Sequence, residues 1–590
     1  MEKKMKKIIS VIMVAVMLCL TLSALVSCGA PEDDGAQISV YLGNEVFDFD
    51  PTDYYVDDNA AELMSLLFEP LFKLNSKGKL ECAGAESYTV DEEEREIVVT
   101  LANTYWSDKV KVCANDYVYA WRNILLNPDN PSPASALLYD IENAVAVKNG
   151  ENSIYALGVA ASDTYELTIT YREGADYRQL LKNLASVSTS PIRQDYYENV
   201  ESYWTKQITT ICTNGAFTIS SVNRDEGLFT IARNLGYHQD PGVVDYTKQV
   251  IPDKLVSFII GDAVTEVNYS DLADKTVFYL GDAPLSDRVA NESSAKVADA
   301  LSTYCYVFNT NHPLLAIKEV RQALSMVIDR EAIAAAVTFG KAATGFLPGT
   351  VLDTATGKSF GTGDLISTTS KLNEAKELLK GVDLTGIDLT ITLTVNDDEE
   401  SKAIANLVKT AWENLGVGIS VTVSAVGCTT SEIVDFTTGE PLEINDSTIQ
   451  SLVKGAAYGK VESDVIAVDW QMYSQDAFVP LAAFSHAMGT AGFDSDANLA
   501  RENITSWWSF EYDTLMNAAY SAKDAETRSA YLHEAEKQLV NAAPIVPILF
   551  NQNFAFVSSD LSGLTVDGYG FFSFTRVSQK NYKQYLPEED

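Results

Sequence analysis

Few side chains in this chain of 590 residues have the type and spacing that catalysis or metal binding requires. The four histidines, His238, His312, His486 and His533, stand far apart, and none belongs to an H-E-x-x-H zinc motif. The sequence contains neither a G-x-S-x-G turn for a nucleophilic serine nor a glycine-rich phosphate loop. A secreted hydrolase that uses two of the many carboxylates stays open as an alternative, because composition alone excludes no acid–base pair. We predict a protein that is not an enzyme and needs no cofactor.

One segment begins like a calcium-binding loop. Asp494, Asp496 and Asn498 alternate in the way that the first oxygen ligands of such a loop do. Leu499 takes the place of the turn glycine, however, and Thr505 stands where the final glutamate belongs. We therefore expect no metal at this segment.

Cys28 is the cysteine with the clearest chemical context. Four lysines and then an apolar run from Ile8 to Leu22 precede it, which is the pattern of an export signal. The order Leu25-Val26-Ser27-Cys28-Gly29 resembles a bacterial lipoprotein signal, in which residues 1–27 are removed and Cys28 is lipidated. More than one acyl chain would anchor the protein stably. The alternative is an uncleaved anchor, although a membrane span needs about 20 apolar residues. Either reading places the body outside the cytoplasmic membrane.

The other cysteines do not form a disulfide framework. After Cys19 in the signal and Cys28, an odd number is left and no C-x-x-C pair occurs. We expect buried thiols, with a single disulfide as the alternative. The residues concerned are Cys82, Cys113, Cys212, Cys305 and Cys428.

The chain is strongly acidic, with a formal net charge of −39. Without residues 1–27, which hold four lysines and one glutamate, 39 basic and 81 acidic residues give −42. Such a surface repels nucleic acid, which we exclude as a partner. The hydrophobic content of 46% is enough for large cores, and the length suits two to four domains of about 150 residues each.

Hydrophobic periodicity predicts a mixture of strands and helices. Residues 389–395 and 419–423 have strand character, and a helix over 404–415 that ends at Gly416 lies between them. This strand–helix–strand unit favours an α/β fold. Residues 429–463 are polar and are predicted to form an irregular surface insertion. Further strands are predicted at 38–42, 96–101, 165–171 and 545–550, further helices at 60–71, 115–126, 320–328 and 531–540, and a tether at 29–37.

A series of stretches is characteristic of one protein family when taken in order. The stretches are LFEPLFKLNSKGKL (67–80), AESYTV (85–90), YWSD (105–108), ANDYVYAWRNIL (114–125), NPDNPSPASA (127–136), TNGAFTI (213–219), IARNLGYH (231–238), TYCYVFNT (303–310), VRQALSMVIDREAI (320–333), ATGFLPG (343–349) and EAEKQLVNAAPIVPI (534–548). Together they resemble family 5 of the extracytoplasmic solute-binding proteins of ABC transporters, and most closely its oligopeptide-binding lipoproteins. The likeness extends over about residues 38–575.

The resemblance implies a two-lobed α/β fold of the type II periplasmic-binding-protein class, in its large cluster, with an inserted β-rich domain. Lobe I would comprise residues 38–60, 190–302 and 545–590, the inserted domain residues 61–189, and lobe II residues 303–544. The ligand of the family lies in the cleft between the lobes, where its backbone pairs with protein strands. Closure then presents a surface to the permease.

The resemblance also implies the positions that contact ligand. They follow the first strand, begin the second lobe and occupy a loop that contains a tryptophan. The residues at these positions are Tyr54, Tyr55, Asp57, Tyr304, Tyr306, Val426, Trp470, Gln471, Met472, Tyr473 and Asp476. In peptide-binding relatives the tryptophan loop supplies an aspartate that pairs with the α-ammonium group of the peptide.

This sequence departs from the family at three of these places. Tyr473 stands where the aspartate is expected in an ungapped alignment from Trp470, and an alignment slip is the alternative explanation. Asp476 could take its place only if the loop follows another path. Val426 replaces a frequent aromatic residue, and Cys305 replaces a frequent tyrosine.

The expected partners are short peptides, the permease and ATPase subunits of an ABC importer, and the membrane through the lipid anchor. The body is expected to act as a monomer. Because of these three departures, the ligand of the relatives cannot simply be assumed for this chain. The alternative is the same fold with another solute, namely a nickel complex, haem, an opine or an oligosaccharide, or a role as a sensor.

Overall fold

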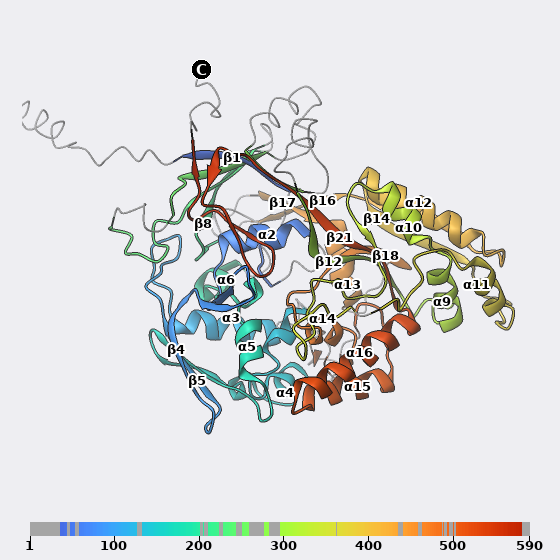
Figure 1. Ribbon diagram of the computed structural model, residues 1–590, viewed down its shortest axis with the longest axis horizontal. Helices are drawn as coiled ribbons and strands as arrows, with labels where there is room; N and C mark the ends of the chain where they lie inside the picture. The colour runs from blue at the N-terminus through green and yellow to red at the C-terminus, as the bar shows by residue number, and fades with distance from the viewer. Residues whose placement is uncertain are drawn as a thin grey trace, which may run out of the picture.

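The computed structural model describes residues 36–43, 48–52, 58–126, 133–200, 205, 211–223, 228–243, 250–258, 277–281, 296–361, 363–434, 441–457, 463–486, 488, 493–494, 499–500 and 503–580. Figure 1 shows a broad molecule in which helices and strands from distant parts of the sequence lie side by side. None of the helices among these residues is long and apolar enough to cross a membrane.

The largest sheet of the described residues has 11 strands and runs through the upper part of the view in Figure 1. In spatial order they are β15 (Ser420–Val426), β14 (Thr390–Asn396), β18 (Val465–Gln471), β12 (Lys296–Phe308), β21 (Ile545–Val557), β11 (Phe278–Gly281), β1 (Gln37–Leu42), β10 (Lys254–Phe258), β9 (Leu228–Arg233) and β8 (Phe217–Asn223), with β13 (Lys341–Ala342) beside β21. The two central strands, β12 and β21, are 13 residues long each and pair antiparallel, so they join the two ends of the sheet.

The predicted strand–helix–strand unit is confirmed. Strands β14 and β15 pair in parallel, and α12 (Glu399–Glu413) connects them. The helix starts at Asp398, whose side chain accepts a hydrogen bond from the backbone N–H of Ser401. It ends before Gly416, which has a φ of 77° that suits glycine. Its apolar face, which includes Val408 and Trp412, packs into the core with α9 (Lys318–Met326), α10 (Arg330–Ala336) and α11 (Leu372–Leu379) nearby.

A separate sheet of four strands lies at the lower left of Figure 1. Its order is β4 (Ala85–Asp91), β5 (Glu96–Leu101), β7 (Glu166–Thr170) and β6 (Val159–Asp163). Helix α2 (Asp58–Leu67) instead packs against β1 and β8 of the large sheet. The other elements in this part of the chain are the pair β2 (Phe72–Leu74) and β3 (Leu80–Cys82), α3 (Ala114–Leu126), η1 (Pro133–Leu138), α4 (Ala144–Lys148), η2 (Ile154–Ala156), α5 (Tyr177–Asn183), η3 (Val187–Thr189) and α6 (Gln194–Val200).

The C-terminal helices lie at the bottom of the view, on the side of α4 and α5. They are α15 (Phe510–Ser521) and α16 (Ala525–Ala542), and α14 (Phe478–Ala482) packs against both of them nearer the middle of the view. Ser509 and Asp524 cap α15 and α16, each accepting a backbone hydrogen bond from within the first turn. Helix α16 leads directly into β21, as the periodicity predicts. Short pairs complete the chain: β19 (Phe493–Asp494) with β20 (Leu499–Ala500), β22 (Leu561–Ser562) with β25 (Ser578–Gln579), and β23 (Thr565–Val566) with β24 (Phe572–Ser573).

The prediction of an irregular insertion over 429–463 is wrong for the described part. Strands β16 (Cys428–Val434) and β17 (Pro441–Ser447) form an antiparallel pair, and α13 (Thr448–Ala457) follows. Helix α13 buries Ile449 and Val453, which lie four positions apart on one face. The prediction failed because this apolar face is short and most of the segment around it is polar.

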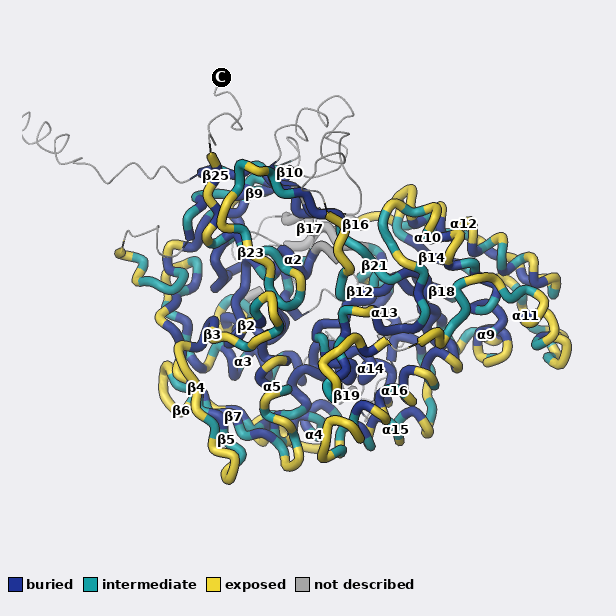
Figure 2. The backbone as a smooth tube through the Cα atoms, viewed as in Figure 1, coloured by how far each residue is buried: buried dark blue, intermediate teal, exposed yellow. Residues whose placement is uncertain are grey.

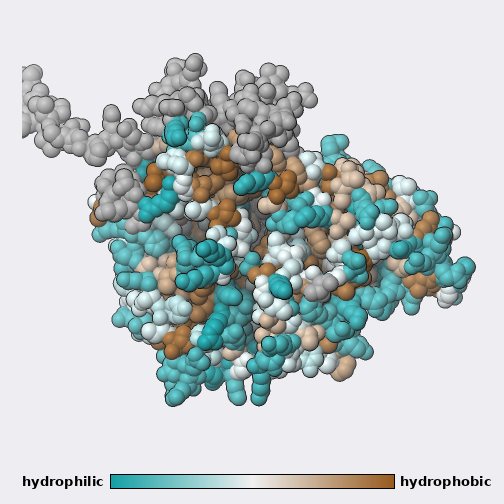
Figure 3. Space-filling view, viewed as in Figure 1, coloured by the Kyte–Doolittle hydropathy of each residue, from teal (hydrophilic) through white to brown (hydrophobic). Residues whose placement is uncertain are grey.

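Two clusters of buried side chains form the core, and Figure 2 shows buried backbone running through the middle of the molecule. The first cluster contains α2, the four-stranded sheet and Trp470, while the second lies between β12, β14 and α12. Strand β12 separates them, because Cys305 and Val307 belong to the first cluster and Tyr304 and Tyr306 to the second. Figure 3 shows hydrophilic residues along the lower edge and the right-hand end of this face, with intermediate and hydrophobic residues between them.

Candidate ligand-binding site

The segment from Asp469 to Asp476 leaves the large sheet and crosses toward the region of η1 and α5. Strand β18 pairs antiparallel with β12, which places Tyr304 opposite Asp469. The Asp469 carboxylate accepts a hydrogen bond of 2.8 Å from the Asn551 side-chain amide of β21. The same amide donates to the Ser302 hydroxyl at 3.0 Å. The three central strands are thereby joined by side chains as well as by their backbones.

Trp470 is fully buried in an aromatic group. Its ring centroid lies 6.0 Å from that of Phe346 and 5.1 Å from that of Phe484. Phe346 is held in place by its carbonyl oxygen, which accepts a hydrogen bond of 3.0 Å from the Thr303 hydroxyl. Trp470 therefore fixes the position of the loop that follows it, since two aromatic rings from other segments contact its rigid ring.

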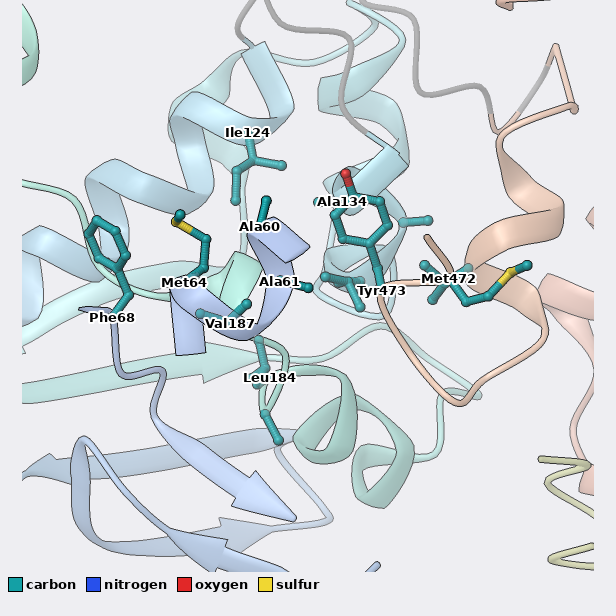
Figure 4. Packing of buried hydrophobic residues seen from close by; sticks show 14 of the residues in the cluster. Ala60, Ala61, Met64, Phe68, Ile124, Ala134, Leu184, Val187, Met472 and Tyr473 are labelled. Carbon is teal, nitrogen blue, oxygen red and sulfur yellow. The ribbon is translucent and has the colours of Figure 1, made fainter. Parts of the chain in front are cut away.

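Tyr473 adopts a left-handed backbone conformation, with a φ of 57°. This conformation is uncommon for a residue with a bulky side chain and turns the chain sharply. Figure 4 shows the Tyr473 ring directed toward Ala134, with Ala60 and Ala61 of α2 in the same cluster, while Met472 points the other way. Tyr473 is thus buried in an apolar contact between the loop and the region of η1 and α2.

Asp476 binds an arginine of α16. Its side chain is 1% exposed and accepts two hydrogen bonds from the Arg528 guanidinium, at 2.8 and 2.6 Å. One of its oxygens also accepts the backbone N–H of Phe478 at 3.1 Å, which starts α14. Such two-pronged pairs are the strong form of charged hydrogen bond. A ligand ammonium group would have to displace Arg528 to use this carboxylate.

The other predicted positions have different surroundings. Tyr304 and Tyr306 are buried in the second core cluster, where the ring of Tyr306 meets that of Trp412 at 6.0 Å. Val426 ends β15, half-buried beside the first cluster. Gln471 and Met472 are buried with Trp470. The ligand contacts expected of these residues stay predictions. Tyr54, Tyr55, Asp57 and Cys28 lie outside the described residues, as do Asp496 and Asn498 of the calcium-like segment.

Glu536 is a further buried carboxyl group near this loop that periodicity does not single out. Its Oε1 accepts the backbone N–H groups of Phe346 and Leu347, at 3.0 and 2.9 Å. Burial raises the pKa of Glu536 to about 7, and the two amides oppose that rise. The residue lines a cavity of about 180 Å³ that also touches Lys341 and Asn551. Among the described residues, no group of three or more His, Cys, Asp or Glu could hold a metal ion.

The sequence also resembles known proteins over most of its length. Residues 79–476 match the family model described as bacterial extracellular solute-binding proteins, family 5 middle. The chain belongs to this family of solute-binding proteins. The match covers more than half of the chain, and the family resemblance predicted from the motifs is confirmed.

Individual relatives support the same assignment. The dipeptide-binding protein DppE of Bacillus subtilis is 24% identical over 573 residues, which cover 93% of this chain and 95% of the relative. The probable deoxycholate-binding periplasmic protein YgiS of Escherichia coli is 23% identical, with 84% of each chain covered. The structure of Listeria monocytogenes OppA bound to peptide superposes with a TM-score of 0.73 at 18% identity, covering 93% of this chain and all of the other. This likeness confirms the two-lobed α/β fold.

Proposed function

We propose that this protein is the lipid-anchored substrate-binding component of an ABC importer, which captures short peptides between its lobes and delivers them to the permease. The observation that carries the proposal is the family match, together with relatives that align with nearly the whole chain and whose names mention peptides. The family is extracellular, which agrees with the export signal before Cys28. The protein acts as a monomer and needs no cofactor.

The proposed lobes follow the boundaries predicted from the sequence. Lobe I contains the β1 end of the large sheet, lobe II contains β14, β15 and β18, and the inserted domain contains the four-stranded sheet, while β12 crosses the boundary after residue 302. The 13-residue strands β12 and β21 connect the lobes and act as the hinge. The ligand lies against the loop from Trp470 to Tyr473, the ends of β12 and β15, and the segment of Tyr54, Tyr55 and Asp57.

Native mass spectrometry tests the peptide part of the proposal. The full chain is purified gently from its host, and the ions released on activation are identified. Peptides of mixed sequence are expected, because backbone pairing tolerates many side chains. A single unrelated small molecule would contradict peptide capture while leaving the solute-binding family intact.

A second candidate is the same fold with a non-peptide solute. Two observations favour it: Tyr473 replaces the expected aspartate, and one relative is named for deoxycholate. Thermal unfolding with di- to pentapeptides and, separately, deoxycholate distinguishes the candidates. A ligand at a hundredfold excess over its Kd stabilises the folded state by about 3 kcal/mol. Stabilisation by deoxycholate alone would favour the second candidate.

Membrane fractionation tests the anchor. Replacement of Cys28 by alanine is expected to release the protein from the membrane fraction, because no acyl chain can then be attached. Replacement of Cys19, which lies inside the same signal, is the matched control and is expected to leave the protein on the membrane. Equal membrane retention of both variants would contradict lipidation.

A further inference from the structure

A group of polar contacts joins two parts of the chain that are more than 280 residues apart; we name this group the seam. The seam consists of Tyr139, Asp140, Arg172 and Asn183 on one side and Ser474, Tyr520 and Arg528 on the other. On the boundaries proposed above, the first side belongs to the inserted domain and the second to lobe II. If the inserted domain moves with lobe I, these are the two bodies that separate when the proposed cleft opens.

Tyr520 makes the central contact of the seam. The Arg172 guanidinium lies 3.8 Å from the centre of the Tyr520 ring, which is the geometry of a cation–π interaction. The Tyr520 hydroxyl donates to the backbone carbonyl of Tyr139 at 3.0 Å. One side chain of α15 therefore holds both the backbone and a charged group of the opposite side.

Asp140 keeps Arg172 in this position. Its carboxylate pairs with Arg172 at 2.7 Å, and both side chains are largely buried, at 16% exposure each. Burial raises the pKa of Asp140, and the charges of Arg172 and then Arg528 oppose that rise. Arg528 comes from α16, so its charge acts on Asp140 from the other side of the seam.

Two further hydrogen bonds extend the contact. The Ser474 hydroxyl donates to the Asn183 side-chain oxygen at 2.9 Å. The Tyr139 hydroxyl donates to the backbone carbonyl of Met488 at 3.0 Å. The seam thus adds a few directional contacts to the apolar contact that Tyr473 makes with the region of η1.

We propose that the seam is a latch, in which Tyr520 and Arg172 set the balance between the closed and open forms and thereby the affinity for ligand. The proposal rests on the proposed function only in that the lobes separate. Loss of the cation–π contact together with the Tyr520 hydrogen bond should shift the closed-to-open ratio by about thirtyfold, since two such contacts together contribute about 2 kcal/mol and each ~1.4 kcal/mol is tenfold.

Small-angle X-ray scattering of the ligand-free full chain tests the latch without knowledge of the ligand. Tyr520→Leu and Arg172→Met are each expected to increase the radius of gyration. The increase in the double variant should be smaller than the sum of the two single increases, because both substitutions remove the same cation–π contact. Arg178→Met is the matched control. Arg178 lies 4.4 Å over the ring of Tyr177 within the first side alone, so it should leave the radius unchanged.

Two milder variants test whether the larger substitutions act only by disrupting the fold. Tyr520→Phe keeps the ring and loses only the hydroxyl, and Ser474→Ala loses only the bond to Asn183, so both should give intermediate radii with an unchanged circular dichroism spectrum. Radii equal to that of the unmodified chain in all seam variants, or additive effects in the double variant, would overturn the latch. A failure of peptide capture in the mass-spectrometry experiment would leave these scattering results unaffected.

Discussion

Two buried carboxyl groups lie at helix α16: that of Asp476, which the helix contacts, and that of Glu536, which belongs to the helix. The loss of hydration on burial is compensated differently for the two groups. Asp476 receives both prongs of the Arg528 guanidinium, from the first turn of the helix. Glu536, two turns further on, receives only the backbone amides of Phe346 and Leu347. A cation offsets the loss of hydration of a charge, whereas two amides offset only part of it. The comparison indicates that Asp476 holds the loop in place by charge, while Glu536 titrates near neutral pH.

The largest effect is expected from breaking the charged pair. Arg528→Met should lower the free energy of unfolding by about 3–5 kcal/mol, because Asp476 is left buried without a counter-charge. Urea unfolding measures it. The double variant Asp476→Asn with Arg528→Met should recover most of the loss. Lys537→Met on the same helix, whose pair with Glu534 is about 60% exposed, is the control and should change little. A small loss in Arg528→Met would contradict the role given to the pair.

The next largest effect is the change in the free energy of unfolding with pH that the titration of Glu536 causes. Its pKa is about 7 in the folded protein against an ordinary value of 4.5, so the folded state retains a proton that the unfolded state has lost. The stability of the native protein relative to Glu536→Gln should therefore fall by about 3 kcal/mol between pH 4.5 and pH 7, and stay level above that. Urea unfolding of both proteins across this range measures it. Parallel stability curves would show that Glu536 titrates normally.

A smaller effect is expected from crowding the Glu536 site. A Cβ atom at Gly345 would lie 2.8 Å from Glu536 Oε1, so Gly345→Ala must displace the carboxyl group from its two amides. Overpacking of this kind costs about 1–3 kcal/mol. Gly381→Ala, where the added atom meets nothing within 4 Å, is the control. Equal melting temperatures for the two variants would contradict the close contact between Gly345 and the Glu536 carboxyl group.

The smallest effect is expected at the exposed pair beside the same cavity. Lys341 and Asp299 pair at 2.6 Å, but their side chains are 56% and 45% exposed. Lys341→Met should change stability by less than about 1 kcal/mol, and the difference should vanish in high salt. Thermal unfolding at low and high ionic strength measures it. A loss of stability as large as that of Arg528→Met would contradict the expectation that exposed ion pairs contribute less than buried ones.

The elements of the fold could be predicted where hydrophobic periodicity was strong. Strand β5 spans 96–101 as predicted, and α12 keeps its apolar face on the core side. Over 429–463 the prediction failed because α13 has only a short apolar face within a polar segment. For the candidate site the structure shows the packing of Tyr304 and Trp470 in the core, and the ligand contacts expected of both residues stay predictions.

The amino-acid sequence by itself determined the family and most strands and helices, because these depend on local order and spacing along the chain. Only the tertiary structure decided that Arg528 occupies the Asp476 carboxylate and that Arg172 meets Tyr520. These pairs join residues that are 52 and more than 300 positions apart, respectively. No periodicity links such residues, since only the packing of α15 and α16 against the loop and the inserted segment brings their charges together.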